Sequence, residues 1–251
     1  MYALVTGASS GIGLEIAKEL DKKGYNIILA ARNIKKLEEI KKELSNKAIV
    51  IQIDLSETNA ALELYDKVKE LEIEIVVNNA GYGIFGEFTK THLEEEINML
   101  KLNIISLHIL TKLFAKKFTE NNKGYILNVS SVAGLMPAGP LLSSYYASKA
   151  YVRSLSLALN EELISKGANV YVSVLCPGPV NTEFNNRAGV KFAVNGISPK
   201  YTAQYAIKKM FDKKAVIIPS FNMRVMALCS RFIPQKAVIK ICHGFQKKKE
   251  K

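Results

Sequence analysis

The chain has 251 residues, of which 48% are hydrophobic, enough to bury one large core. No continuous apolar run approaches the roughly 20 residues that a membrane-spanning helix requires. No signal-peptide pattern precedes the first apolar segment, so we expect a cytoplasmic protein. Cys176, Cys229 and Cys242 show no metal-ligand spacing, which argues against a metal site. The net charge is +12, and residues 222–251 hold eight basic residues and one acid, a net +7.

Seven short apolar segments alternate with longer segments whose apolar residues recur at three- and four-residue spacing, as Ile12, Ile16 and Leu20 do. Short, almost continuous apolar strands are typical of a sheet covered on both faces, and helical crossovers are typical of parallel pairing. We therefore predict an α/β fold: a doubly wound, Rossmann-like parallel sheet of about seven strands with helices on both faces. The predicted strands are Tyr2–Thr6, Tyr25–Ala30, Ala48–Ile53, Ile73–Val77, Gly124–Val129, Asn169–Leu175 and Ala215–Ile218.

The first predicted strand runs into a glycine-rich turn, followed by a predicted helix over Leu14–Lys23. Gly7 permits a sharp bend, Gly11 lets the backbone approach a pyrophosphate, and Gly13 lets the helix pack closely on the strand. The helix N-terminus offers free N–H groups and a partial positive charge to the pyrophosphate. No Gly-Lys-Ser or Gly-Lys-Thr follows, so this is not a nucleoside-triphosphate loop. A tight turn without a ligand is the alternative, but the position at the first strand–helix junction favours a dinucleotide.

The residues after the second predicted strand distinguish between the two nicotinamide dinucleotides. A carboxylate there would hold the ribose 2′-hydroxyl of NAD. This sequence has Arg32 and no acid, and a guanidinium pairs with a phosphate through two hydrogen bonds. We therefore expect NADP(H) as the preferred cofactor, with NAD(H) as the alternative. An ordinary surface arginine that opens a helix is the competing interpretation.

Tyr145 and Lys149 lie four positions apart at the start of an apolar-periodic helix, so their side chains share one face, whereas Tyr146 is expected to face elsewhere. A phenol with a pKa of about 10 is a poor base at neutral pH. A cation about 4 Å away contributes about 4 kcal/mol at an effective dielectric of about 20, and desolvation of the phenolate opposes part of this. We expect a net lowering of the pKa that makes Tyr145 a general acid/base near neutrality.

The sequence resembles the short-chain dehydrogenase/reductase superfamily, in its group of single-domain members of about 250 residues. The matching motifs are Thr6-Gly7-x3-Gly11-Ile12-Gly13, Asn78-Asn79-Ala80-Gly81, Ser130-Ser131, Tyr145-x3-Lys149 and Pro177-Gly178-Pro179-Val180-Asn181-Thr182. They occur in family order and at family-like spacing over residues 2–220. The resemblance covers most of the chain.

The resemblance implies a role for each matching residue. Tyr145 would transfer a proton to or from the substrate oxygen, Lys149 would lower its pKa and hydrogen-bond the nicotinamide ribose, and Ser131 would hold the substrate oxygen. Asn103 would hold Lys149 through a water and extend a proton relay. The implied cofactor contacts are Gly7, Ser9, Ser10, Gly11, Ile12 and Gly13 in the turn, Asp54 and Leu55 at the adenine, Asn79, Ala80 and Gly81 towards the adenosine, and Pro177, Gly178, Val180 and Thr182, the last at the nicotinamide amide. Arg32 joins them as the expected contact of the 2′-phosphate.

Two features depart from the family pattern. Tyr145 follows Ser131 by 14 positions, one more than the commonest spacing, so Ser130 stays an alternative and the loop between is expected to bulge. Glu74 stands where an aspartate is usual, a change that we interpret as structural. Asn103 has its own alternative, as a solvated helix residue.

Two apolar segments, Leu135–Leu142 and Phe184–Ser198, are expected to close over the nicotinamide, the second as a mobile lid. Such walls favour a small hydrophobic carbonyl or alcohol substrate, such as a steroid or an acyl chain.

Residues 221–251 are predicted to be a basic amphipathic C-terminal extension to a dinucleotide-binding catalytic domain of residues 1–220. Helix-compatible stretches run over Met223–Arg231 and Gln235–Phe245. The extension is expected either to pack over the pocket or a neighbouring subunit, or to lie on an anionic membrane surface. No recognition motif supports nucleic-acid binding, so we predict no nucleic-acid partner.

These observations predict an NADP(H)-dependent oxidoreductase that moves a hydride between nicotinamide and a carbonyl or secondary alcohol. A 3-oxoacyl thioester reductase is one alternative. A non-catalytic dinucleotide-binding sensor is another, but a sensor has no need of Ser131, Tyr145 and Lys149 together. The resemblance implies a homo-oligomer, a dimer or a tetramer.

Overall fold

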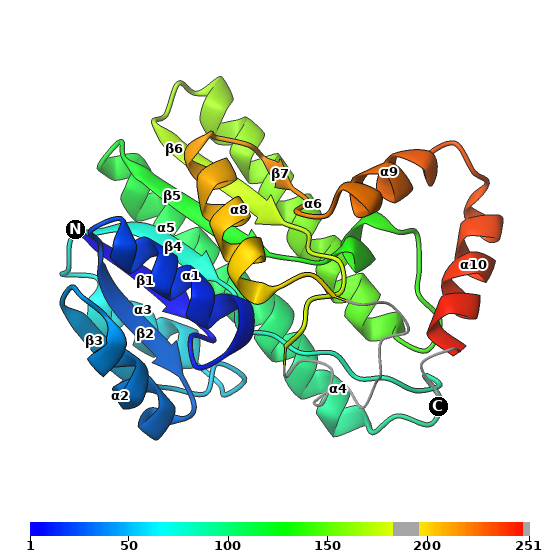
Figure 1. Cartoon of the computed structure of the whole chain (residues 1–251), viewed down its shortest axis with the longest axis horizontal. Coiled ribbons are helices and arrows are strands. Elements are labelled where there is room, and N and C mark those ends of the chain that lie inside the picture. Colours follow the sequence, from blue (N-terminus) through cyan, green and yellow to red (C-terminus); the bar gives the residue numbers. More distant parts are fainter. Residues whose placement is uncertain (183–195, 248–251) are drawn as a thin grey trace.

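The computed structural model of the chain describes residues 1–182 and 196–247 (Figure 1). A seven-stranded parallel sheet has the order β3-β2-β1-β4-β5-β6-β7, which confirms the predicted doubly wound fold. Every predicted strand is present, with ends that differ by at most one residue. The strands are β1 Tyr2–Thr6, β2 Asn26–Ala31, β3 Ala48–Gln52, β4 Ile73–Asn78, β5 Gly124–Val129, β6 Val170–Leu175 and β7 Val216–Ile217.

Helices cover both faces of this sheet, again as predicted. Their bounds are α1 Gly11–Lys22, α2 Ile34–Glu43, α3 Ala60–Val68, α4 Leu93–Leu100, η1 Lys101–Ser106, α5 Leu107–Glu120, η2 Val132–Leu135, α6 Ser143–Ser165, α8 Pro199–Phe211, α9 Phe221–Cys229 and α10 Gln235–Lys247. Side chains of a strand alternate between faces. Ala3 and Val5 therefore pack in one core with α1, α2 and α8, whereas Leu4 packs in the other with α3, α5 and α6.

Helix α1 begins at Gly11, three residues before the predicted start. The glycines of this turn have low helix propensity, which is why the sequence favoured a later start. In the structure Gly7 has a φ of +65°, so the chain bends sharply after β1 and enters the helix at once. The early start brings the first turn of the helix to the carboxyl end of the sheet, where a phosphate would meet its free N–H groups.

Among the described residues, one helical stretch, Leu93–Glu120, is long and apolar enough to cross a membrane by length and composition. It comprises α4, the π-helix η1 and α5, and 39% of its most apolar 18-residue window is buried. Leu110, Phe114 and Phe118 of α5 are fully or almost fully buried against the sheet. This packing places α5, the last part of the stretch, against the core of the fold.

The last two helices extend from the body at the end of the sheet where β6 and β7 lie (Figure 1). The two predicted helical stretches are confirmed, with α9 beginning and ending two residues early and α10 ending two residues late. Ala227 of α9 and Val238 and Cys242 of α10 form a small buried cluster with Met136, which follows η2. The extension is therefore fixed to the loop that precedes Tyr145.

Candidate active site

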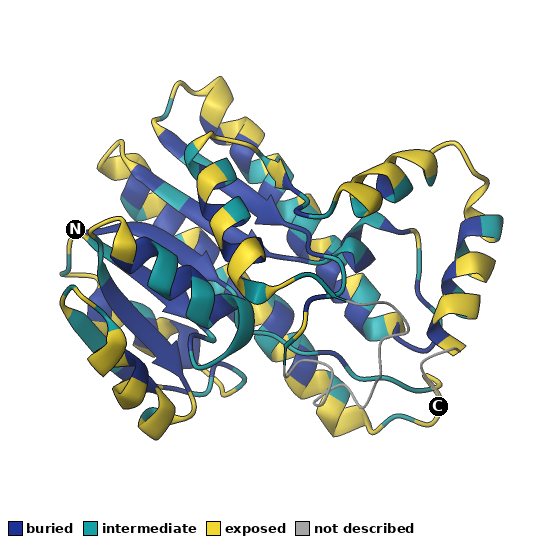
Figure 2. Cartoon of the chain, in the orientation of Figure 1, coloured by how far each residue is buried: buried dark blue, intermediate teal, exposed yellow. Residues whose placement is uncertain are grey.

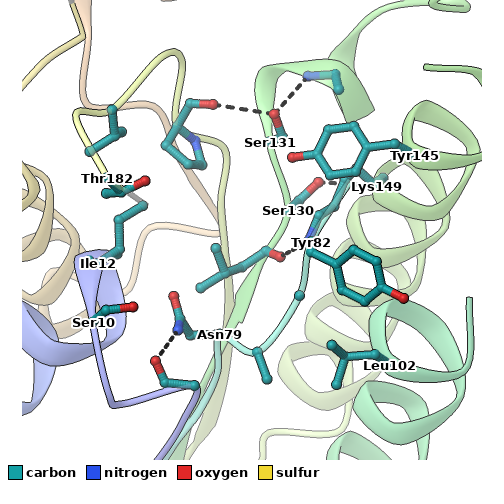
Figure 3. A pocket seen from close by; sticks show the side chains of 18 of the residues that line it. Ser10, Ile12, Asn79, Tyr82, Leu102, Ser130, Ser131, Tyr145, Lys149 and Thr182 are labelled. Carbon is teal, nitrogen blue, oxygen red and sulfur yellow. Dashed lines mark hydrogen bonds between the residues drawn. The ribbon is translucent and has the colours of Figure 1, made fainter. Parts of the chain in front are cut away.

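A cavity of about 510 Å³ opens at the carboxyl ends of the strands. It brings together almost all of the sequence-predicted site residues (Figure 3). Gly13 and Asn103 do not line it and lie directly behind its wall. The predicted residues that line it are Gly7, Ser9, Ser10, Gly11, Ile12, Arg32, Asp54, Leu55, Asn79, Ala80, Gly81, Ser131, Tyr145, Lys149, Pro177, Gly178, Val180 and Thr182.

The glycine-rich turn is fixed to the end of β4. The Asn79 amide nitrogen donates hydrogen bonds of 3.0 and 3.2 Å to the carbonyls of Thr6 and Gly7. The Thr6 hydroxyl accepts from the backbone N–H groups of Asn79 and Ala80. A Cβ atom at Gly13 would lie 2.4 Å from the Gly7 carbonyl oxygen and from the Asn79 amide nitrogen. Gly13 therefore permits the close packing of helix and turn that the sequence predicted.

The far end of the cavity holds Arg32 and Asp54, from the ends of β2 and β3. Their side chains form a 3.5 Å ion pair, and 59% of the Arg32 side chain is exposed. Burial alone would raise the pKa of Asp54, but hydrogen bonds from Ser56 and the charge of Arg32 lower it below its usual value. Asn33, which also lines the cavity, caps α2 by accepting a 3.1 Å hydrogen bond from the Lys36 N–H. The exposed guanidinium thus lies beside a helix N-terminus, a setting suited to an anion.

Tyr145, Ser131 and Lys149 lie at the other end of the cavity (Figure 3). The Ser131 hydroxyl is a hydrogen-bond partner of the Tyr145 phenol. It also accepts a 3.2 Å hydrogen bond from the Ala133 N–H and lies 3.5 Å from the Pro177 carbonyl. The Lys149 ammonium donates a 2.9 Å hydrogen bond to the Val129 carbonyl. Each polar atom is therefore held in place by the ends of β5 and β6 and by α6.

The expected lowering of the Tyr145 pKa is wrong for this arrangement. Burial raises the pKa of Tyr145 to about 12, and the hydrogen bond with Ser131 offsets only part of the rise. Burial also lowers the pKa of Lys149 to about 8. Desolvation penalises both charged forms and outweighs their attraction, because both side chains are more than nine-tenths buried. Tyr145 is therefore a protonated phenol at neutral pH.

The structure separates the roles of the two adjacent serines. Ser130 is 2% exposed and donates a 2.7 Å hydrogen bond to the Lys149 carbonyl, so its hydroxyl holds α6 against β5. Ser131 faces Tyr145 instead. Ser131 is therefore the better candidate for holding a substrate oxygen. In the loop that carries the extra residue, Leu141 has a left-handed φ of +68°, which accords with the predicted bulge.

Asn103 lies in the π-helix η1 and is fully buried, so the alternative of a solvated helix residue is wrong. Its side chain accepts from the Tyr82 N–H at 3.1 Å, donates to the Tyr82 carbonyl at 2.9 Å and donates to the Ser148 hydroxyl at 3.2 Å. A Cβ atom at Gly81 would lie 2.8 Å from the Asn103 oxygen and 3.3 Å from the Lys149 ammonium. Gly81 therefore lets Asn103 approach Lys149, and the predicted relay through a water stays a prediction.

Glu74 is 9% exposed and forms a 3.3 Å ion pair with Lys123 at the opposite end of β4 from the cavity. Its carboxylate also accounts for part of the raised pKa of Tyr25, which follows mainly from burial. This location supports a structural role.

Among the described residues, no three histidine, cysteine or acidic side chains gather as a metal site would require.

Sequence reasoning missed several residues of the cavity wall. Tyr146 was expected to face elsewhere, but it lines the cavity with its ring edge-on to Tyr145, because the cavity curves around the start of α6. Its hydroxyl accepts a 2.7 Å hydrogen bond from Gln246 of α10, which also lines the cavity. The other missed residues are Ala30, Ala31, Asn33, Ile53, Tyr82, Leu102, Val129, Val132, Ala133 and Pro179.

The predicted apolar walls are present in part. Met136, Leu141 and Leu142 are buried, and Leu142 lines the cavity. Of the predicted lid Phe184–Ser198, residues 184–195 lie outside the described residues. Its last residues are described, and Ile197 pairs with Val180 in an isolated bridge.

Comparison with known proteins agrees with this fold. The family model described as short chain dehydrogenase matches residues 1–193. The chain is 36% identical over 189 residues to 17-beta-hydroxysteroid dehydrogenase type 3 of Homo sapiens, covering 72% of this chain and 59% of that protein. It is 37% identical over 190 residues to very-long-chain 3-oxoacyl-CoA reductase of Homo sapiens, covering 72% and 60%. The chain therefore belongs to the short-chain dehydrogenase family.

A solved structure supports the same assignment. A short-chain dehydrogenase from Sphingobium yanoikuyae in complex with NADPH superimposes with a TM-score of 0.82 at 29% identity, covering 92% of this chain and 93% of that one. The two curated human relatives are longer, and this chain spans about three fifths of their length.

Proposed function

We propose that the protein is an NADP(H)-dependent oxidoreductase that interconverts a carbonyl and a secondary alcohol. The observation that carries the proposal is the contact of Ser131 with Tyr145, one helical turn from Lys149, at one end of a cavity whose other end holds the glycine-rich turn and Arg32. A dinucleotide laid along this cavity supplies a hydride at the end where Tyr145 lies. The site fits such a cofactor, since the first turn of α1 and the guanidinium both offer hydrogen-bond donors to phosphate.

The chain's own residues then carry out the proton transfer. Ser131 donates a hydrogen bond to the substrate oxygen and orients it beside the Tyr145 hydroxyl. Tyr145 donates its proton to that oxygen as it becomes an alkoxide, which is a stronger base than a phenolate. The pKa of about 12 keeps the phenol protonated at neutral pH, so it is ready to donate. Lys149 stabilises the phenolate that remains. A protonated phenol is the form that reduction of the carbonyl requires.

We further propose a hydrophobic substrate. The wall next to Tyr145 includes Leu142, Ala133 and Tyr146. The named relatives act on a steroid and on a very long acyl chain, as their names state, and both are largely apolar. A 3-oxoacyl thioester is therefore the second candidate beside a steroid-like ketone. A sensor without turnover is disfavoured because Ser131, Tyr145 and Lys149 share one end of the cavity.

The test is consumption of NADPH with a panel of carbonyl substrates, containing 17-ketosteroids, 3-oxoacyl-CoA thioesters, simple aliphatic ketones and keto sugars. Turnover of either lipophilic class that Tyr145→Phe abolishes supports the proposal. Efficient turnover of keto sugars alone would reject the hydrophobic substrate, and no turnover with tight NADPH binding would favour the sensor.

Two further expectations stay proposals, the oligomeric state, which rests on the family, and the location in the cell, which rests on the sequence pattern. Homo-oligomers are usual in the family, so we propose a dimer or a tetramer, to be measured by light scattering during size-exclusion chromatography. The cytoplasmic location is likewise a proposal, to be tested by cell fractionation.

A further inference from the structure

The outer side of α9 carries an apolar surface. Phe221, Val225 and Leu228 recur at positions i, i+4 and i+7 of the helix, so they share one face. Phe232 follows in the turn after the helix. Their exposed fractions are 71%, 44%, 57% and 83%. We call these four residues the α9 stripe, and Figure 2 shows the exposed outer side of this helix.

The α9 stripe does not result from a loosely placed helix. The other side of α9 is packed on the body, where Ala227 is 9% exposed and lies in a cluster with Val238 and Met136. Met223 lies against Gly178 of the cavity wall. A Cβ atom added to Gly178 would lie 2.7 Å from the Met223 Cγ atom. Arg224 donates hydrogen bonds to the Ile218 carbonyl and the Tyr205 hydroxyl. The helix therefore has a fixed orientation that leaves the apolar stripe in solvent.

The segment that carries the α9 stripe has only positive charges. Residues 221–247 contain no aspartate or glutamate. Their basic residues are Arg224, Arg231, Lys236, Lys240 and Lys247, all of them exposed. On α10 the exposed Ile241 lies among these lysines. Large apolar side chains within a purely basic surface are the pattern of a segment that lies on an anionic membrane.

A second copy of the chain is the other occupant to consider. A two-fold dimer places the same surface against itself. Here that would bring Arg224 and Arg231, which lie on α9 and in the turn after it, near the same two cations of the other copy, without an acid in either segment to pair with them. Lipid headgroups of the opposite sign remove this repulsion. The charges therefore favour the membrane over a dimer at this surface.

We propose that the α9 stripe is a docking surface for anionic lipid bilayers. The four apolar side chains enter the headgroup region, while Lys236, Lys240 and the neighbouring basic residues contact anionic headgroups. The sheet stays outside the bilayer. The inner side of α10 lines the cavity through Gln246, so the docked helices border the substrate site. The docking itself does not depend on the proposed oxidoreductase activity.

The test is co-sedimentation of the full chain with vesicles of phosphatidylcholine that contain about 30% phosphatidylserine. The wild-type protein is expected to sediment with these vesicles and less with phosphatidylcholine alone. The double variant Phe221→Ser/Phe232→Ser is expected to lower the partition coefficient about tenfold or more. The double variant Lys236→Glu/Lys240→Glu is expected to lower it at least tenfold on the anionic vesicles, and raised salt should mimic this loss.

Phe88→Ser is the matched control, because Phe88 is 64% exposed and lies in the loop before α4. It should bind vesicles like the wild type. Equal melting temperatures and NADPH binding would establish that each variant folds. Absence of wild-type binding, or equal binding by all variants, would overturn the proposal. So would a change from dimer to monomer in the Phe221→Ser/Phe232→Ser variant with vesicle binding unchanged, since a second copy would then be the occupant.

Discussion

The ammonium nitrogen of Lys149 lies 5.8 Å from the centroid of the Tyr145 ring, one helical turn along α6. The two side chains are buried together, and burial shifts their pKa values in opposite directions, up to about 12 for the phenol and down to about 8 for the ammonium. Each shift favours the neutral form. The pair is therefore arranged to give up a proton from Tyr145 rather than to hold a phenolate before reaction.

Replacing Tyr145 by phenylalanine removes the proton donor and leaves the ring. A positioned general acid contributes about 10²- to 10⁴-fold, so kcat/KM for carbonyl reduction should fall by about that factor. Binding of NADPH, followed by its fluorescence, should change little. The matched control is Tyr146→Phe, which removes only the hydroxyl that accepts from Gln246 and should retain most activity. Retained activity in Tyr145→Phe would reject the assigned proton donor.

The pKa of Lys149 predicts a pH profile. Its value of about 8 lies below the ordinary lysine value, so the ammonium is present below pH 8 and is lost as the pH rises through it. Because the cation stabilises the developing phenolate, kcat/KM for reduction should be constant below about pH 7 and fall above about pH 8. In Lys149→Arg the cation does not titrate in this range, so the fall near pH 8 should disappear even though activity is lower. An unchanged profile in that variant would assign the fall to another group.

The strands, the glycine turn and the shared helix face of Tyr145 and Lys149 were predictable because each depends on local pattern, whereas Ser131 and Asn103 were assigned from the family resemblance. Two-residue alternation, three- and four-residue spacing and glycine position are properties of short segments. The pKa of Tyr145 was not predictable, because its direction depends on how deeply both side chains are buried. Sequence spacing placed the two side chains on one face of the helix, but it did not give the desolvation that sets the direction of both pKa shifts.

The contact of Tyr146 with Gln246 was also beyond sequence reasoning. It joins residues 100 positions apart and depends on how α10 docks against the start of α6. The sequence left the C-terminal extension with two interpretations, packing over the pocket or lying on a membrane. The structure shows that the two are compatible, since α10 lines the cavity with one side and exposes basic residues on another.

Ser130 and Ser131 should respond differently to substitution. Ser131→Ala removes the hydrogen-bond partner of Tyr145, so kcat should fall about 10- to 100-fold with little change in stability. Ser130→Ala leaves the Lys149 carbonyl without its 2.7 Å hydrogen bond, so the free energy of unfolding should fall by about 1–3 kcal/mol. Steady-state kinetics and urea unfolding of both variants make the comparison. If Ser130→Ala lowered kcat and Ser131→Ala lowered only stability, the substrate contact would be assigned to Ser130 instead.

Arg32 should determine the choice of cofactor. Arg32→Ala removes the exposed guanidinium at the end of β2, and a hydrogen bond to a charged group contributes about 1.5–3 kcal/mol. The ratio of kcat/KM for NADPH to that for NADH should therefore fall about 10- to 100-fold, mainly through the KM for NADPH. Lys35→Ala, a nearby exposed lysine on α2, is the matched control and should change the ratio much less. An unchanged ratio in Arg32→Ala would contradict the assignment of the 2′-phosphate contact to Arg32.

Gly13 and Gly244 offer a paired test of packing at the cofactor turn. A methyl group at Gly13 would lie 2.4 Å from the Gly7 carbonyl oxygen, and both this oxygen and the Asn79 amide are fixed by the turn. Gly13→Ala should therefore lower the free energy of unfolding by about 1–3 kcal/mol and weaken NADPH binding, because helix and turn must move apart. At Gly244 in α10 an added methyl group meets nothing within 4 Å. Gly244→Ala should raise stability by up to about 1 kcal/mol, because alanine has the higher helix propensity. Urea unfolding measures both effects, and a Gly13→Ala protein as stable as the wild type would show that the turn can relax away from the helix.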